Sequence, residues 1–447
     1  MNFDTPNSTL AESLVKLTLR ISRAGRREEA LQAIEEAVEL YRQLAVDNPS
    51  SLNPDLARSL LGLSHRLADV GRQEEALHAI EEGIMLCREL TSEQPVFNRD
   101  LAISLIWLSE CWDQQGHQQE GLLPMEEAVK IFRQLAADRP ATLNPDLAVS
   151  LNGLAMSLYD AGRREEALQA IEEAVELFRE LAEEHPAESN PDLAMALYVL
   201  SDCLSDVDRI GEALEAIEEA VDLYQTLAAE HPVIFDPDLG RSLSRLAICL
   251  SAMDRQGEAL QAAKAAVELR RQSAEEHPTV FNPGLASSLH NLANCLSDVG
   301  RREDALQAIE EAVELRRQAA ANHPSIFNPN LALSLNNLSN YLSDVGRKDE
   351  ALEKINEAVE LHRELVAQHP GVFNHNMAVS LNNLSNRLTE LGHHNDAIIA
   401  MDEIVELRRQ LSAERPAVFK QDRSKSLDDL ANRAFYASRS YECYTSS

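Results

Sequence analysis

The chain repeats itself about every 46 residues, and this period limits its possible folds more than any other feature. Successive repeats open with a Leu-Ala-x-Ser-Leu-type segment at intervals of 46 residues, with a single interval of 45. The segment from Gly25 to Leu40 returns letter for letter at Gly162 to Leu177. Such a period predicts a stack of similar units, each packed on its neighbours. The openings are at Leu10, Leu56, Leu101, Leu147, Leu193, Leu239, Leu285, Leu331 and Met377.

Each repeat carries the pattern of two amphipathic helices. In the repeat that opens at Leu331, the first helix is expected to begin after Asn328-Pro329 and to end at Gly346. A second helix is expected from about Lys348 to Gln368, where His369-Pro370 ends it. One hairpin of this kind cannot bury both of its apolar faces, so the repeats must stack. The apolar stripe of the first helix is Leu331, Leu335, Leu338 and Leu342.

The residue types at fixed places in the repeat resemble the tetratricopeptide repeat. With Leu335 as the fourth residue, small residues stand at 8 (Ser339), 20 (Ala351) and 27 (Ala358), and a glycine stands at 15 (Gly346). The usual unit of that family has about 34 residues. The longer unit here is similar to the repeats of kinesin light chain, of nephrocystin, and of sensor arms on fungal and bacterial STAND NTPases.

The pattern and the resemblance together predict an all-α protein, a right-handed α-solenoid of about eight helix-turn-helix repeats plus a partial ninth. We expect an N-terminal tail at 1–9, a continuous solenoid at 10–422, a partial capping repeat at 423–433 and a C-terminal tail at 434–447. Counting 46 residues on from Met377 reaches Arg423, where Ser426-Leu427 keeps only the end of the opening motif.

Two departures from the repeat pattern predict local differences. Asp208 and Asp254 replace the turn glycine, which aspartate can do because it tolerates the left-handed backbone region. In the repeat from Leu101, Gly121 replaces a small alanine and Pro124 falls inside the second helix. Because proline removes a helical hydrogen bond, we expect a bend there.

The charge balance excludes several classes of partner. The 447 residues include 74 acidic and 41 basic side chains, for a formal charge of −33. A field of this sign repels nucleic acid and anionic lipid surfaces, so we expect neither as a partner. The start, MNFDTPNSTL, lacks the basic and apolar regions of a signal peptide, and no long apolar run occurs. The expected location is the cytoplasm.

Cysteine and histidine residues give no sign of a structural metal or disulfide. Four of six cysteines share one repeat position, too far apart from repeat to repeat for bridging. Five histidines precede a proline at a helix end, one per repeat, where they suit the helix dipole better than a metal ion. His393-His394 stands at the last inter-helix turn, where other repeats have pairs such as Arg301-Arg302 or Arg347-Lys348, and we expect no metal ion there. The cysteines are Cys111, Cys203, Cys249 and Cys295, and the histidines are His185, His231, His277, His323 and His369.

The sequence offers no catalytic constellation. No P-loop, nucleophile elbow, zinc-protease helix or dinucleotide-binding turn occurs. Glutamate pairs such as Glu310-Glu311 recur in each repeat, as expected of a solvated helix face. We therefore predict that the protein is not an enzyme and uses no cofactor.

The resemblance implies a concave groove lined by the first helices, at repeat positions 2, 5, 6, 9, 12 and 13. In the last three repeats, asparagines cluster at positions 5, 6 and 9. An amide offers two donors and an acceptor, enough to pair with the main chain of an extended peptide. We expect Asn337 and Asn383 to face solvent in the free protein. The alternative is that duplication copied a tolerated polar residue. The predicted peptide-binding residues are Asn291, Asn294, Asn336, Asn337, Asn340, Asn382, Asn383 and Asn386.

The corresponding positions of the N-terminal half are more apolar, with Trp107, Tyr159 and Tyr198 as the predicted apolar groove. The alternative for these side chains is packing between helices. Position 13 is acidic in six repeats, which favours a neutral or basic ligand. The lysine-rich clamp of chaperone-binding relatives is missing, so acidic chaperone tails are not expected to bind. The acidic residues are Asp69, Asp160, Asp206, Asp298, Asp344 and Glu390.

The function predicted from these features is that of a scaffold or adaptor that holds a protein or an extended peptide in its groove. The alternative is a regulatory or sensor arm of a larger STAND-type NTPase receptor or effector, present here without its catalytic domain. The sequence names no ligand and assigns no oligomeric state.

Overall fold

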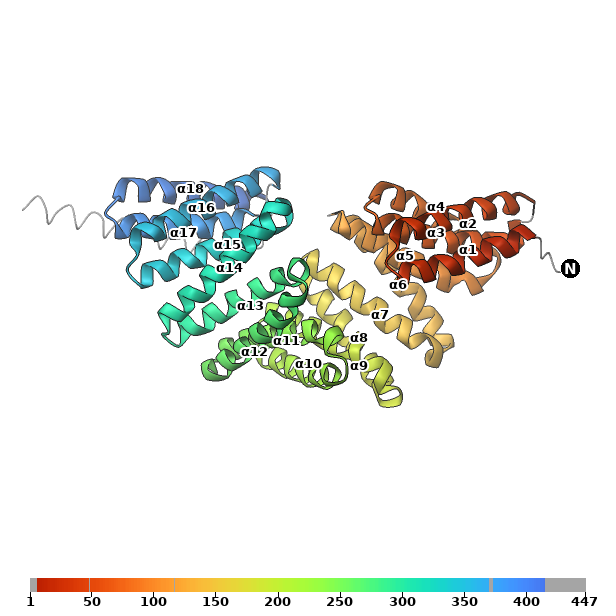
Figure 1. Cartoon of the computed structure of the whole chain (residues 1–447), viewed down its shortest axis with the longest axis horizontal. Coiled ribbons are helices and arrows are strands. Elements are labelled where there is room, and N and C mark those ends of the chain that lie inside the picture. The colour runs from red at the N-terminus through yellow and green to blue at the C-terminus, as the bar shows by residue number, and fades with distance from the viewer. Residues whose placement is uncertain (1–5, 48, 116, 370–372, 415–447) are drawn as a thin grey trace, which may run out of the picture. The chain divides into compact units, whose positions relative to one another are not determined.

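The computed structural model describes residues 6–47, 49–115, 117–369 and 373–414, and within them the regular structure is helical (Figure 1). The helices of the first five repeats are α1 (Pro6–Arg23), α2 (Arg27–Asp47), α3 (Pro49–Asp69), α4 (Gln73–Glu93), η1 (Pro95–Phe97), α5 (Asn98–Gln114), α6 (Gln118–Asp138), α7 (Pro140–Asp160), α8 (Arg164–Glu184), α9 (Pro186–Asp206) and α10 (Ile210–Glu230). The others are α11 (Pro232–Ala252), α12 (Gln256–Glu276), α13 (Pro278–Asp298), α14 (Arg302–Asn322), α15 (Pro324–Asp344), α16 (Lys348–Gln368), α17 (Asn374–Glu390) and α18 (His394–Glu414).

The predicted all-α repeat fold is confirmed. The described helices form nine successive pairs, one for each opening from Leu10 to Met377, which is one more than the estimate of about eight complete repeats. The chain divides into two compact units, residues 1–223 and 224–447. The expected capping repeat at 423–433 and the tail at 434–447 lie outside the described residues. No described helix has an apolar window long enough to cross a membrane.

Alanine and leucine form the core between paired helices. The predicted apolar stripe of α15 is buried, and the residues that face it from α16, Ala351, Ile355 and Ala358, are also buried. The two helices approach each other closely where they cross, and there the hydroxyl of Ser339 donates to the carbonyl of Ala351 at 2.8 Å. Ser64 makes the same bond to Ala76 at 2.8 Å. Small residues at positions 8 and 20 of the repeat allow this close approach.

The turns within each hairpin follow the sequence prediction. Gly346 has a φ of +85°, and the amide of Arg347 donates to the carbonyl of Leu342 at 2.8 Å, which closes the end of α15. Asp208 and Asp254 take the same left-handed conformation, with φ of 62° and 60°. The prediction that aspartate replaces the turn glycine is confirmed.

The first helix of the repeat that opens at Leu331 begins earlier than predicted. Helix α15 starts at Pro324, five residues before the expected Asn328-Pro329 boundary, and only His323 separates it from α14. The reason is that Pro324 occupies the first helical position, where its missing N–H costs nothing, and keeps the preceding His323 out of the helical region, at φ −137° and ψ 73°. Pro329 therefore lies inside the helix, at its sixth residue.

Helix α6 continues through Pro124 from Gln118 to Asp138, so the proline does not interrupt it. The bend expected at this residue stays a prediction. Gly121, the other departure in this repeat, has a clear cause. A Cβ added there would lie 2.8 Å from Oδ1 of Asp113 and 3.0 Å from the carbonyl oxygen of Ser109. An alanine here, as in the other repeats, would displace the side chain of Asp113 and crowd the carbonyl of Ser109.

Candidate functional site

The eight predicted asparagines lie on three first helices of the second unit. Asn291 and Asn294 are on α13, and the remaining six are on α15 and α17. Helices α13 and α15 each pack on the second helix between them, and α15 also contacts α17. The repeat thus brings amides from successive helices close to one another.

Four of these asparagines bond to one another or to their neighbours. Nδ2 of Asn337 donates to Nε2 of His290 at 3.0 Å and approaches Oδ1 of Asn294 at 3.4 Å. Nδ2 of Asn383 donates to Oδ1 of Asn336 at 3.0 Å. We call these four amides, with His290, the amide ladder. It links position 6 of one repeat to position 5 of the repeat before.

The ladder corrects one expectation from the sequence. Asn337 and Asn383 were expected to face solvent, but both are half-buried and donate to a neighbouring repeat, and Asn336 is only 4% exposed. A polar side chain that loses water on folding needs a partner within the protein. Sequence position alone did not show that these partners are supplied by the adjacent helix.

The other four asparagines remain available to a ligand. Asn291, Asn340, Asn382 and Asn386 are half-buried, and among the described residues their amides make no hydrogen bond. None of their polar atoms is both buried and unpaired, so these amides reach solvent. Asn340 and Asn386 occupy the same position of consecutive repeats. We call these four residues the free amides.

The buried guanidinium of Arg316 lies next to His290 of the amide ladder. Arg316 on α14 is 6% exposed, and its Nη1 donates to the carbonyl of Asn330 at 2.8 Å and to the hydroxyl of Ser334. Burial lowers the pKa of Arg316 to about 10. Nδ1 of His290 lies 3.1 Å from the same hydroxyl. Arg316 thus connects α14 to α15 through hydrogen bonds next to the amide ladder.

His290 is held in its neutral form. Burial, with a smaller contribution from the nearby charge of Arg316, lowers the pKa of His290 to about 4. Nε2 of the neutral ring accepts a hydrogen bond from Asn337, while Nδ1 lies 3.1 Å from the hydroxyl of Ser334 and 3.5 Å from Nη1 of Arg316. The histidine therefore acts as an acceptor in the ladder.

The predicted apolar groove of the first unit is largely occupied by packing. The ring of Trp107 stacks on His65 with 3.5 Å between centroids, and its Nε1 donates to the hydroxyl of Ser64 at 2.9 Å. The guanidinium of Arg164 lies 4.1 Å from the ring centre of Tyr159, and burial raises the pKa of Tyr159 to about 12. Tyr198 is half-buried on α9. These contacts favour the packing alternative for the two aromatic side chains Trp107 and Tyr159.

The acidic residues at position 13 are exposed, and arginines compensate several of them. Asp69 pairs with Arg66 at 3.0 Å, and Asp206 pairs with Arg164 at 3.0 Å. In the second unit, Asp298 accepts a hydrogen bond from Ser251, while Asp298 and Asp344 form no ion pair within the described residues. The edge beside the free amides thus keeps negative charge.

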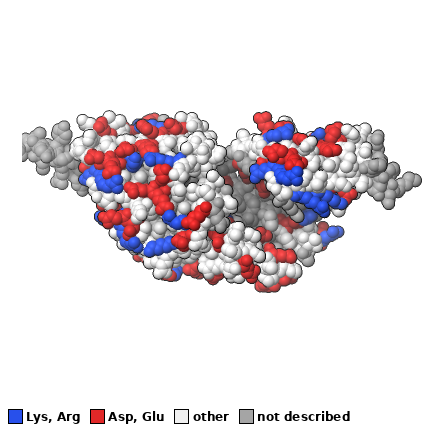
Figure 2. All heavy atoms as spheres, in the orientation of Figure 1, with Lys and Arg blue, Asp and Glu red and all other residues white. Residues whose placement is uncertain are grey.

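The glutamate pairs lie on an exposed face, as the sequence predicts. Glu311 pairs with Arg271 at 2.9 Å and Glu310 with Arg347 at 3.4 Å, each bridging neighbouring repeats. Figure 2 shows acidic and basic side chains side by side on both units. Exposed pairs of this kind add little stability each.

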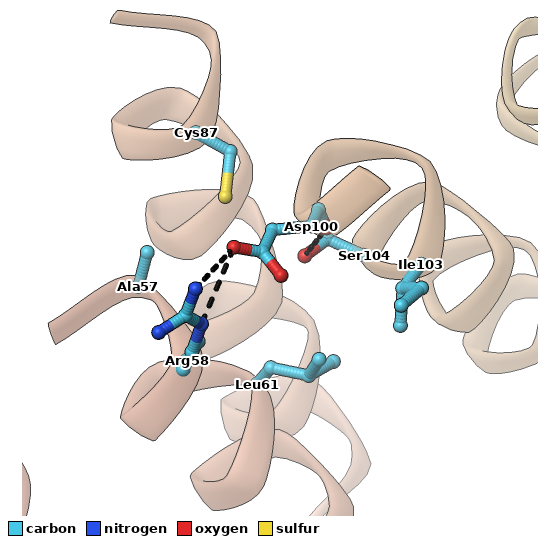
Figure 3. Close-up of a pocket in the computed structure, with 7 residues that line it drawn as sticks. All are labelled: Ala57, Arg58, Leu61, Cys87, Asp100, Ile103 and Ser104. Carbon is cyan, nitrogen blue, oxygen red and sulfur yellow. Dashed lines mark hydrogen bonds and ion pairs between the residues drawn. The ribbon is translucent and has the colours of Figure 1, made fainter. Parts of the chain in front are cut away.

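A small pocket between α3, α4 and α5 offers no reactive group. Figure 3 shows the guanidinium of Arg58 directed at Asp100, and its Nη2 lies 2.9 Å from Oδ2. Burial raises the pKa of the neighbouring Cys87 to about 11, which keeps the thiol protonated at neutral pH. The volume of about 40 Å³ suits water rather than a substrate.

Family models match several segments of the chain. Two models, each described as tetratricopeptide repeat, match residues 146–226 and 284–364, and residues 377–414. Residues 146–226, 284–364 and 377–414 therefore match tetratricopeptide repeats. A model of anaphase-promoting complex subunit 5 also matches residues 4–55, 44–111 and 238–282. The comparison with curated proteins finds no match.

Solved structures of repeat proteins resemble parts of the chain. BtubC (BKLC) from P. vanneervenii is 17% identical over 56% of this chain and 92% of its own, with a TM-score of 0.45. A putative kinesin light chain from Podosopora anserina with nearly identical tetratricopeptide-like repeats is 23% identical over 51% and 98%, with a TM-score of 0.39. A Rap protein complexed with Competence and Sporulation Factor is 12% identical over 81% and 99%, with a TM-score of 0.46.

Proposed function

We propose that this protein is a scaffold that binds an extended peptide segment of a partner protein along α13, α15 and α17. Tetratricopeptide repeats support a protein-binding role in general, and the free amides support this particular surface. Of the eight asparagines predicted from the sequence, they are the four whose amides make no hydrogen bond within the described residues.

The chemistry of the free amides suits a peptide main chain. Each amide can donate to a carbonyl and accept from an N–H, so it can pair with a peptide group whatever side chain the peptide carries. Neighbouring helices pack roughly 8–10 Å apart, and an extended chain advances about 3.3 Å per residue, so Asn340 and Asn386 could pair with every third residue. The ladder fixes the helices that carry these amides.

The charge beside the free amides sets the class of peptide. Asp298 and Asp344 stand on exposed helix ends without an ion pair among the described residues. A peptide that brings a carboxylate to this edge would meet repulsion, whereas a lysine or arginine would find a partner. The peptide expected here is neutral to basic.

Peptides selected from a random twelve-residue display library on the full chain provide the test. We expect the double variant Asn340→Ala and Asn386→Ala to bind a selected peptide about ten-fold or more weakly, because each lost hydrogen bond costs about 0.5–1.5 kcal/mol. Fluorescence anisotropy with the labelled peptide measures the Kd.

The matched control changes the same residue type on the other helices of the same repeats. Asn356 on α16 and Asn395 on α18 are exposed, and replacing both with alanine should leave the Kd unchanged. Equal affinity of the Asn340/Asn386 variant and the wild type would exclude the free amides as the binding surface. Loss of binding in the control variant would place the peptide on the second helices.

A further inference from the structure

An open hollow of about 410 Å³ lies on the first unit, between the second helices α4 and α6. The buried side chains of Ile84 and Leu105 are among those that line it, together with the half-buried Pro124. Two large side chains at its mouth are exposed to solvent: Met85 by 62% and Leu123 by 69%. It shares no residue with the free amides, which are all on the second unit.

Both exposed side chains stand at positions that are polar elsewhere in the chain. Met85 takes a place that is charged in the other eight repeats, and Leu123 takes a place that is polar in seven of them. The residues at the place of Met85 are Glu39, Lys130, Glu176, Asp222, Glu268, Glu314, Glu360 and Glu406. Those at the place of Leu123 are Gln32, His78, Gln169, Glu215, Gln261, Gln307, Glu353 and, in the last repeat, Ile399.

The coincidence of these two residues is what distinguishes this hollow. They come from different repeats, and the fold places both on the same depression. Pro124 adds a third apolar group where the neighbouring repeats have the smaller Ala79 and Ala170. An exposed cluster of large apolar side chains is costly in water unless another molecule covers it. The repeat fold does not require this exposed apolar cluster, since the other repeats form the same helix pairs without it.

The rim of the hollow is acidic. Glu81, Glu120 and Glu127 line it with Arg88 as the one basic side chain. Nη2 of Arg88 is already paired with Glu127 at 2.8 Å, which leaves the charges of Glu81 and Glu120 without a cation from the lining. A partner with lysine or arginine next to its apolar anchor would therefore be favoured over one with carboxylates.

We propose that this hollow, formed by Met85, Leu123 and Pro124 above Ile84 and Leu105, is a second docking site. Its occupant is an amphipathic segment of a partner protein that inserts large apolar side chains and carries lysine or arginine beside them. The site extends the scaffold function with a surface on the second helices, and it does not depend on the free amides. A partner could thus be held at two places on the chain.

The test uses three labelled helical peptides of equal length. The first has leucines along one face and lysines on the other, the second has glutamates in place of the lysines, and the third keeps the lysines but has glutamines in place of the leucines. The first should bind the wild type at least about ten-fold more tightly than either of the others. Because the chain is acidic overall, the third peptide separates docking from nonspecific attraction of a cation.

Variants of the protein use residues that the other repeats tolerate at the same places. Met85→Glu with Leu123→Gln should weaken binding of the first peptide by about ten-fold or more, since both side chains are lost from the apolar contact. The matched control is Ile399→Gln, which removes an equally exposed apolar residue from α18 and should leave the Kd unchanged. Asn340→Ala with Asn386→Ala should also leave it unchanged, which separates this site from the proposed peptide groove.

Three results would overturn the proposal. The first is wild-type affinity in the Met85/Leu123 variant while circular dichroism shows an intact fold. The second is equal binding of the leucine-lysine and glutamine-lysine peptides. The third is a wild type that sediments as a dimer and a Met85/Leu123 variant that sediments as a monomer, because the hollow would then be covered by a second copy of the chain.

Discussion

We expect His290 to make the protein less stable as the pH falls from about 6.5 to about 4. In the folded state the pKa of His290 is lowered to about 4, mainly by burial, whereas an unfolded histidine titrates near 6.5. Between these values the unfolded chain binds a proton that the folded chain does not, so protonation favours unfolding. Above about pH 6.5 His290 causes no loss of stability. Below about pH 4 the loss of unfolding free energy attributable to His290 reaches about 3 kcal/mol.

Thermal unfolding followed by circular dichroism at pH 7, 5.5 and 4 measures this loss. For a unit of about 220 residues, about 3 kcal/mol corresponds to a fall in Tm of roughly 6–12 °C. Carboxylates also titrate in this range, so the comparison is with His290→Gln, which cannot take up a proton and keeps an oxygen acceptor for Asn337. The variant should start less stable at pH 7 and lose less on acidification. His375→Gln, on the exposed side of α17, should follow the wild type. Parallel pH profiles for the wild type and His290→Gln would contradict the assignment.

The amide ladder should carry more stability than asparagine on a helix surface normally does. Asn337→Ala leaves Nε2 of His290 without a donor, and Asn383→Ala leaves Oδ1 of Asn336 without one. An unpaired buried polar atom costs about 1–3 kcal/mol, and the better helix propensity of alanine returns about 0.5 kcal/mol at each site. The double variant should therefore be less stable by about 1–5 kcal/mol.

The control for the ladder is the pair of free amides at the neighbouring position. Asn340→Ala with Asn386→Ala removes the same chemical groups from the same helices but breaks no hydrogen bond among the described residues. Urea unfolding should show its midpoint unchanged or slightly raised, well above that of the Asn337/Asn383 variant. If both double variants unfold at the same urea concentration, the ladder contributes nothing to stability.

The fold could be predicted from the sequence because the same pattern of apolar positions and turn residues recurs in every repeat. The apolar stripe of α15, the extent of α16 and the left-handed turn at Asp254 all follow from local rules that nine repeats confirm independently. The start of α15 was misplaced, since Pro324 and Pro329, five residues apart, both suit a helix beginning. Only the geometry of His323 shows that Pro324 is the one used.

The candidate site was predicted less completely, because its hydrogen bonds and ring contacts join side chains from neighbouring repeats. The sequence places Asn337 and Asn340 on similar faces of one helix, but it does not tell which of them meets His290 on the helix before. Trp107 was placed in a groove for the same reason, although it stacks on His65 of the previous repeat. Met85 and Leu123 were missed. The signal was present in the alignment of the repeats with one another, where both interrupt polar positions.

We infer that a bound peptide lies against the first helices of the last three repeats. Hydrogen exchange of the full chain, with and without a peptide from the random display library, measures this most directly. We expect slower exchange on binding for amides of α13, α15 and α17, with α14, α16 and α18 little changed. Protection confined to α14, α16 and α18 would contradict this placement of the peptide. So would protection of α13, α15 and α17 that persists unchanged in the Asn340/Asn386 variant.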